Sequence, residues 1–217
     1  MYQFFVNPEQ INRNDNTVII TGSDVNHIKN VLRMRIGEEI SVSNGQDGCE
    51  DRCGIEAFEE DCVRCKLYFI KEEGTELPVE VTLFQALPKG DKMELIIQKA
   101  VELGAAAIVP VQSRNCVVKL DDRKSESKIR RWQAIAESAA KQSKRSVIPA
   151  VHSPVNWKEA LEMSGGFDVR IIPYEEKNGL TSMCEAIISL LPGRRIAVYI
   201  GPEGGFDPLE VSMARRH

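Results

Sequence analysis

The alternation of apolar runs with amphipathic segments after residue 79 limits this chain to few folds. Apolar runs that we expect to be strands occupy 79–86, 107–111, 147–151, 169–172 and 196–200. Helical patterns lie between them, at 91–104, 125–143, 157–163 and 182–190. In the first of these, Asp91 and Glu94 form a capping-box-like pair, and one apolar face is shared by Met93, Ile96, Ile97, Ala100 and Leu103. Strands that alternate with helices form a mostly parallel sheet covered on both faces. The C-terminal part of the chain is therefore predicted to have an α/β fold.

The N-terminal part has a different pattern. Short β-prone runs occupy 2–6, 17–21, 39–43 and 62–70, separated by turn signals such as Asn44–Gly48. One helix fits from the cap Ser23 to about Leu32, and it would bury Val25, Ile28 and Leu32. The polar segment Lys71–Glu80 contains Gly74 and Pro78 and is the best boundary. We therefore predict a small β-barrel over residues 1–72 and the α/β domain over residues 73–217.

Charge is distributed unevenly along the 217 residues, whose net charge is −4. Residues 1–73 carry 8 basic and 14 acidic side chains, whereas residues 114–145 carry 10 basic and 4 acidic ones. A local basic stripe on an acidic protein is typical of an anion-binding face, although a solvated helix face would have the same composition. The sequence has no apolar run of about 18 residues and no signal-peptide pattern at its start, so we expect a cytoplasmic protein.

Four of the six cysteines raise the question of zinc. Cys49, Cys53, Cys62 and Cys65 have the spacing C-x3-C-x8-C-x2-C. No histidine and no second C-x2-C pair supports this spacing, and residues three apart on a strand point to opposite faces. We therefore expect reduced thiols on a β-hairpin and no metal.

The segment Gly201-Pro202-Glu203-Gly204-Gly205 follows the last apolar run. Ligands of parallel sheets bind beyond the carboxyl ends of the strands, and adjacent glycines let a ligand approach the backbone N–H groups. Glu203 adds an acceptor for a ribose hydroxyl or a cationic group. A tight turn would explain Gly201 alone, so the whole segment favours a ligand-binding loop. The sequence lacks the phosphate-binding motifs of NTPases and of dinucleotide-binding folds.

Four motifs resemble one family in sequence and in order: HIKNVLRMRIGEEI, PKGDKMELIIQKAVELGAAAIVPV, WQAIAESAAKQSKRSVIPAV and IGPEGGF. From Tyr2 to Arg216 the chain resembles the ribosomal small-subunit methyltransferases that modify uridine N3 in 16S rRNA, members of the SPOUT superfamily. The resemblance implies a PUA-like RNA-binding barrel and a SPOUT-type α/β domain with a trefoil knot. It also implies S-adenosylmethionine (AdoMet) as methyl donor and a homodimer with the active site at its interface.

The resemblance assigns roles to individual residues. Expected cofactor-binding residues are Pro173, Tyr174, Ile200, Gly201, Pro202, Glu203, Gly204 and Gly205, with Glu175 beside them. Expected RNA contacts are His27, Arg33, Lys89, Lys92, Arg114, Gln142, Lys144 and Arg145. Gln142 is a candidate for reading the uracil edge. Glu203 and Arg145 are the candidate catalytic residues.

The sequence departs from the family pattern in two places. Asn115 stands where we expect a basic residue, although Arg114 is adjacent. The family continues with a Leu-Gly-x-Arg segment that completes the knot, whereas this sequence ends inside a helix that Asp207 should cap. We therefore expect AdoMet affinity and dimerisation to depend on that further segment. Two other functions stay open at this point: a non-catalytic RNA-binding relic, and a small-molecule α/β enzyme that binds a nucleotide at the glycine-rich loop.

Overall fold

The computed structural model describes residues 1–72, 75–117, 122–174 and 191–217, without the side chains of 122–124. The chain divides into two compact units, one of Met1–Glu76 with Ala140–Ile148 and one of Leu77–Ala139 with Pro149–His217. Segment 140–148 therefore belongs to the first unit, whereas the sequence had placed it in the second domain. Within the described ranges, no helix is long and apolar enough to cross a membrane.

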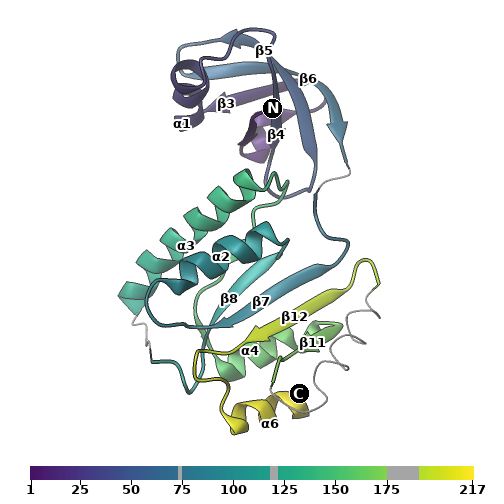
Figure 1. Cartoon of the computed structure of the whole chain (residues 1–217). Coiled ribbons are helices and arrows are strands. Elements are labelled where there is room, and N and C mark those ends of the chain that lie inside the picture. The colour runs from purple at the N-terminus through teal and green to yellow at the C-terminus, as the bar shows by residue number, and fades with distance from the viewer. Residues whose placement is uncertain (73–74, 118–121, 175–190) are drawn as a thin grey trace. The chain divides into compact units, whose positions relative to one another are not determined.

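The first unit is built on a six-stranded sheet curled into a half-barrel (Figure 1). The strand order is β1-β4-β5-β6-β3-β2, in which β1 pairs with β4 in parallel and the other pairs are antiparallel. Its strands are β1 (Gln3–Phe5), β2 (Ile11–Asn12), β3 (Thr17–Thr21), β4 (Glu39–Ser43), β5 (Glu50–Phe58) and β6 (Cys62–Lys71). The sequence predicted four of these strands, whereas β2 and β5 are additions of the structure.

Alternating side chains of the curled sheet fill the core of the first unit. Val18 and Ile20 of β3 are fully buried with Ile40 and Val42 of β4. The predicted helix is present as α1 (Ser23–Asn26), although its N-cap is Gly22 and not the predicted Ser23, and it continues as a π-helical turn, His27–Val31. Two of its predicted core residues, Val25 and Ile28, are buried. Short amphipathic runs therefore predicted most of the elements that line this core, but not β5, which contributes Cys53 and Ile55.

The cysteines of the first unit do not converge on a metal site. Cys53 and Cys65 are buried in the core, and burial raises the pKa of each thiol to about 12. Cys49 and Cys62 are only partly buried. Among the described residues, no group of three or more His, Cys, Asp or Glu side chains is placed to hold a metal ion. Cys53 and Cys65 are thus protonated core residues near neutral pH.

The second unit contains the predicted parallel sheet, with strand order β10-β8-β7-β12-β11 and β9 paired with β8. Its strands are β7 (Glu80–Ala86), β8 (Ala107–Gln112), β9 (Ala150–Val151), β10 (Val155–Asn156), β11 (Val169–Ile171) and β12 (Arg195–Ile200). Strand β9 is shorter than the predicted 147–151. Its expected first residue, Val147, instead donates its amide to Glu76 of the first unit, 3.2 Å away.

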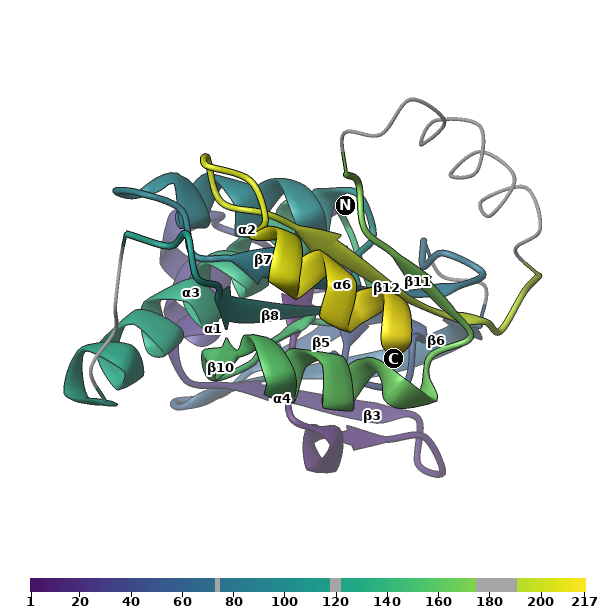
Figure 2. The same cartoon turned by 90° about the horizontal axis from the view of Figure 1, so that it is seen from below.

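Helices cover both faces of the second sheet (Figure 2). They are α2 (Lys92–Glu102), α3 (Asp122–Gln142), α4 (Trp157–Met163) and α6 (Pro208–Arg216). On the face of α4 and α6, Tyr199 stacks on Phe84 with ring centroids 4.7 Å apart, and Trp157 packs edge-on against Tyr199. The predicted helix over 182–190, which includes Cys184, lies outside the described residues.

The ends of the helices show where local sequence signals succeed and fail. Asp207 caps α6 as predicted, accepting from the Leu209 amide at 2.8 Å. The predicted pairing of Asp91 with Glu94 at the start of α2 is wrong, because the Asp91 side chain makes no cap and Glu94 pairs with Arg131. Leu103, predicted to share the apolar face of this helix, is 78% exposed, because the buried face of α2 is formed by Met93, Ile97 and Val101.

Candidate functional site

The glycine-rich loop after β12 crosses the carboxyl edge of the second sheet. Its Glu203 carboxylate accepts from the amide of Lys89, which follows β7, at 3.2 Å. Its Gly205 carbonyl accepts from the Asn115 side chain, which follows β8, at 3.1 Å. Because β12, β7 and β8 are neighbours in the sheet, the loop passes over the ends of two strands besides its own. This edge is where open α/β sheets bind their ligands.

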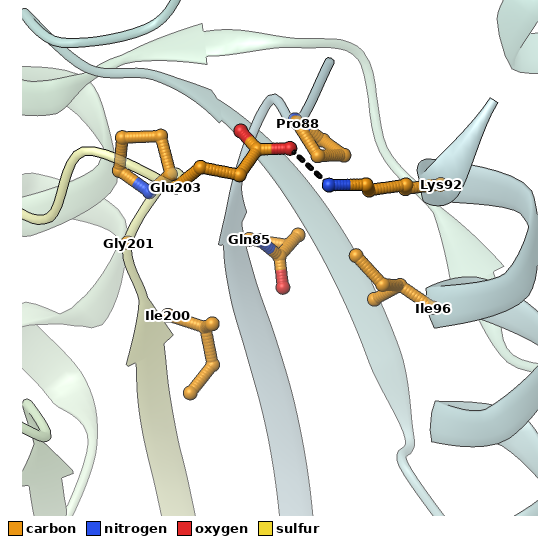
Figure 3. A pocket seen from close by; sticks show the side chains of 8 residues that line it. Gln85, Pro88, Lys92, Ile96, Ile200, Gly201 and Glu203 are labelled. Carbon is orange, nitrogen blue, oxygen red and sulfur yellow. Dashed lines mark hydrogen bonds and ion pairs between the residues drawn. The ribbon is translucent and has the colours of Figure 1, made fainter. Parts of the chain in front are cut away.

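A cavity of about 260 Å³ opens between this loop and the start of α2. It is lined by Gln85, Pro88, Lys92, Ile96, Ile200, Gly201, Pro202 and Glu203 (Figure 3). Ile96, Ile200 and the prolines make most of the wall apolar. Gln85 is 3% exposed, and its side-chain amide donates to the Ala86 carbonyl at 2.8 Å. An apolar cavity with a few fixed polar groups is the usual form of a small-molecule site.

The Glu203 carboxylate lies at the mouth of this cavity, 2.8 Å from the ammonium of Lys92 (Figure 3). The hydrogen bond from Lys92, together with bonds from backbone amides, lowers the pKa of Glu203 to about 2. A carboxylate with this pKa is ionised at neutral pH and is a weak proton acceptor. The contacts therefore favour a role for Glu203 in holding the loop and a ligand, rather than in removing a proton.

The glycines of the loop are required for different reasons. A side chain at Gly201 would lie 3.3 Å from the ring of Phe206, and Gly205 has a φ of 71° that favours glycine. Gly204 has neither constraint, since the nearest atom to an added Cβ is the Cβ of Asn115 at 3.8 Å. The fold of this unit therefore leaves room for a side chain at position 204. A glycine there keeps the backbone open to an approaching ligand.

The structure brings part of the predicted site together. Ile200, Gly201, Pro202 and Glu203 line the cavity with Lys92, and the Arg114 guanidinium lies 3.6 Å from Asp207 just beyond the loop. Pro173 and Tyr174 are exposed and follow β11, the strand beside β12. Glu175 lies outside the described residues.

The remaining predicted RNA contacts belong to the first unit. His27, Arg33, Gln142 and Lys144 are exposed there, and Arg33 and Lys144 have φ angles of 52° and 57°. Non-glycine residues in this left-handed region are uncommon and cluster at functional sites.

Arg145 differs from the other predicted RNA contacts. Its guanidinium side chain is only 4% exposed and pairs with the Glu76 carboxylate, with Nε at 3.1 Å from Oε2. A phosphate cannot reach a guanidinium that is buried in this way. The structure therefore points to a structural role for Arg145 instead of the predicted contact with RNA.

Sequence reasoning missed several residues of the site. Gln85 was read only as part of an apolar strand, although a single amide in the run VTLFQA was a usable signal. Ile96 was predicted only as part of the apolar face of its helix, and it lines the cavity. Asn115 was noted only as a departure, and its contact with Gly205 depends on a chain crossing that no local pattern reveals.

Comparisons with known proteins agree with this architecture. A family model described as an RNA methyltransferase domain matches residues 75–217, and one described as an RNA methyltransferase PUA domain matches residues 20–50. The chain is 43% identical over 198 residues to the ribosomal RNA small subunit methyltransferase E of Bacillus subtilis, covering 90% of this chain and 77% of that protein.

Two solved structures extend the similarity to the fold. A crystal structure of a hypothetical protein has a TM-score of 0.87 and 38% identity, covering 99% of this chain and 85% of that one. The ribosomal RNA small subunit methyltransferase E of Neisseria gonorrhoeae, solved with bound S-adenosyl methionine, has a TM-score of 0.77 and 29% identity. That alignment covers all of this chain and 86% of the other.

The half-barrel, the parallel sheet and the loop across its carboxyl edge define an RNA methyltransferase of the SPOUT superfamily. The predicted family and the predicted fold class are both confirmed. More narrowly, the chain belongs to the ribosomal RNA small subunit methyltransferase E family.

Proposed function

We propose that this protein transfers a methyl group from AdoMet to N3 of a uridine in the 16S rRNA of the small ribosomal subunit. Membership of the family supports methyl transfer to small-subunit rRNA, and a relative was solved with S-adenosyl methionine bound. The observation that carries the proposal is the glycine-rich loop, which leaves backbone at Gly204 open above the ends of three parallel strands. The choice of uridine N3 rests on the resemblance of the four sequence motifs.

The loop and the cavity beside it have groups that suit the ribose and the ammonium group of AdoMet. The backbone at Gly204 is open to the polar atoms of the ligand, while the neighbouring Gly205 amide is bonded to the Pro202 carbonyl at 2.8 Å. The ionised Glu203 can accept from the ribose hydroxyls or the ammonium group of the ligand. The cavity of about 260 Å³ is slightly below the usual range of about 300–1,000 Å³ for small-molecule sites. AdoMet would therefore occupy the cavity only in part and extend along the loop.

The reaction depends mainly on the alignment of the methyl donor with uridine N3. AdoMet supplies a methyl group that is already activated by its sulfonium. This chain must hold the uridine so that N3 faces that methyl group, and such positioning can contribute about 7–11 kcal/mol. A paired or stacked uridine hides N3, so the base must turn out of its stack. Glu203 is a weak base because of its low pKa, and we assign it to binding.

RNA binding is assigned to both units. The exposed cations Arg33 and Lys144 of the first unit are suited to phosphate contacts, with His27 and Gln142 exposed on the same unit. In the second unit, Lys92 lines the cavity, Lys89 donates its backbone amide to Glu203, and Arg114 follows β8. We further propose that the protein acts as a homodimer, as the family resemblance implies.

Identification of the methylated product tests this function. The full-length protein, AdoMet and small ribosomal subunits that lack the modification should yield N3-methyluridine, which mass spectrometry of nuclease digests can distinguish from isomers methylated elsewhere. A methyl group on another atom would keep the enzyme class and refute the N3 assignment. RNA binding without any methyl transfer would favour the non-catalytic relic. AdoMet binding with no affinity for RNA would favour a small-molecule enzyme.

A further inference from the structure

Helix α6 contains a buried carboxylate that the proposed reaction does not use directly. Glu210 is 3% exposed, and its two oxygens accept from two different backbone segments. Oε1 accepts from the amide of Arg114 at 2.8 Å, and Oε2 accepts from the amide of Asp207 at 3.1 Å. One side chain therefore joins the segment that follows β8 to Asp207, two residues beyond the glycine-rich loop.

The contact between Glu210 and Asp207 is an ordinary capping box, whereas the contact with Arg114 is not. In a capping box, the third residue of a helix accepts from the backbone of the capping residue, and Glu159 does this for Asn156 at the start of α4. Glu159 is exposed and binds one amide in this way. Glu210 is buried and reaches a second amide in a segment 96 residues away. Helix capping alone does not explain this second bond.

Two neighbouring contacts join the same pair of segments. The Asn115 side chain donates to the Gly205 carbonyl at 3.1 Å, and the Arg114 guanidinium lies 3.6 Å from the Asp207 carboxylate. On the other side of the loop, Glu203 is bound to Lys89 and Lys92. The backbone between Glu203 and Asp207, which includes the open Gly204, is thus held at both ends.

We propose that Glu210 is a positioning residue for the cofactor: it fixes the glycine-rich loop in its ligand-binding shape by bonding it to the segment after β8. This inference rests on the proposed function, because it takes the loop to be the AdoMet site. A loop that is already ordered loses less conformational entropy when the ligand binds, so its affinity is higher.

Glu210→Gln tests this inference, with Glu159→Gln as its matched control. Glutamine has one acceptor oxygen, so its NH₂ group must face one of the two backbone amides and that hydrogen bond is broken. Both substitutions remove the charge of a capping box, but only the first affects the loop. We expect Glu210→Gln to weaken AdoMet binding in a calorimetric titration by at least tenfold, and Glu159→Gln to leave it within twofold of wild type.

Amide hydrogen exchange without AdoMet separates this inference from the proposed function. Glu210→Gln should speed exchange at Arg114 and across 204–207, while Glu159→Gln should not. Asn115→Ala removes only an exposed side chain and should also speed exchange across 204–207. This variant provides the exchange measurement if Glu210→Gln does not fold. Unchanged exchange in Glu210→Gln and Asn115→Ala would overturn the positioning role. Failure of the wild type to bind AdoMet would instead refute the proposed function, and the exchange result would still decide the role of Glu210.

Discussion

Three carboxylate side chains in or near the glycine-rich loop have different roles. Glu203 is partly exposed and paired with Lys92, Asp207 caps a helix, and Glu210 is buried against backbone amides. The sequence identified the cap of Asp207, because that signal is local. It could not identify the partners of Glu203 and Glu210, because Lys92 and Arg114 lie about a hundred residues away along the chain.

Glu203→Gln distinguishes a binding role from a proton-accepting role at this position. The lowered pKa means that the pairing with Lys92 is complete above the usual glutamate value of about 4.3 and is lost only as the pH falls through about 2. Glu203 therefore has the same charge throughout pH 6–9. We expect Glu203→Gln to raise the KM for AdoMet severalfold and to leave the shape of the pH dependence of kcat unchanged over that range.

The control for this experiment is Glu162→Gln. Glu162 is also an exposed glutamate paired with a lysine, Lys158, but it lies in α4. Glu162→Gln should leave both the KM for AdoMet and the pH dependence of kcat unchanged. If Glu203→Gln instead removed an acidic limb from the pH profile of kcat, Glu203 would be the general base and its assignment to binding would be wrong.

At the scale of elements, patterns of burial were predictable and the pairing of distant polar residues was not. Strand β3 and helix α4 have the predicted bounds because their apolar residues recur with a clear period. Strand β5 was missed because it opens with Glu50-Asp51-Arg52. Asp51 is nevertheless fully buried, since Arg13 from another part of the chain binds both of its oxygens. The sequence of β5 alone does not show that Arg13 compensates the buried charge of Asp51.

The turn that follows α1 is the element that we expect to contact RNA in the first unit. It passes through the π-helical residues His27–Val31 to the exposed, left-handed Arg33. Removal of one cation that binds a phosphate should reduce the slope of log K against log salt concentration by about 0.7–0.9. Arg33→Ala should therefore weaken binding to a small-subunit rRNA fragment at low salt and reduce the slope by this amount.

Arg64→Ala is the control for this measurement. Arg64 is also an exposed arginine of the first unit, but it pairs with Glu59, so it offers little net charge to a phosphate. Its removal should leave the slope unchanged. Equal slopes for Arg33→Ala and the wild type would show that the turn is a solvated surface.

At the scale of the whole molecule, the two units were predictable but their membership was not. The linear boundary near residue 72 omits segment 140–148, which belongs to the first unit. Glu76 holds that segment there, because it binds the Arg145 guanidinium and the amides of Ser146 and Val147. Gln3 and Thr75 bind the same segment, by donating to the carbonyls of Arg145 and Lys144. A boundary drawn from composition cannot reveal contacts between residues so far apart along the chain.

We propose that the glycine-rich loop of the second unit binds AdoMet through its open backbone. Calorimetric titration of AdoMet into the full-length wild type and into Gly204→Val tests it most directly. Gly165→Val is the matched control, because Gly165 also has open space for a side chain and lies outside the loop, after α4. We predict binding by the wild type and Gly165→Val, and a loss of at least a hundredfold in affinity for Gly204→Val. Equal affinity in all three proteins would contradict the claim and remove this loop from the cofactor site.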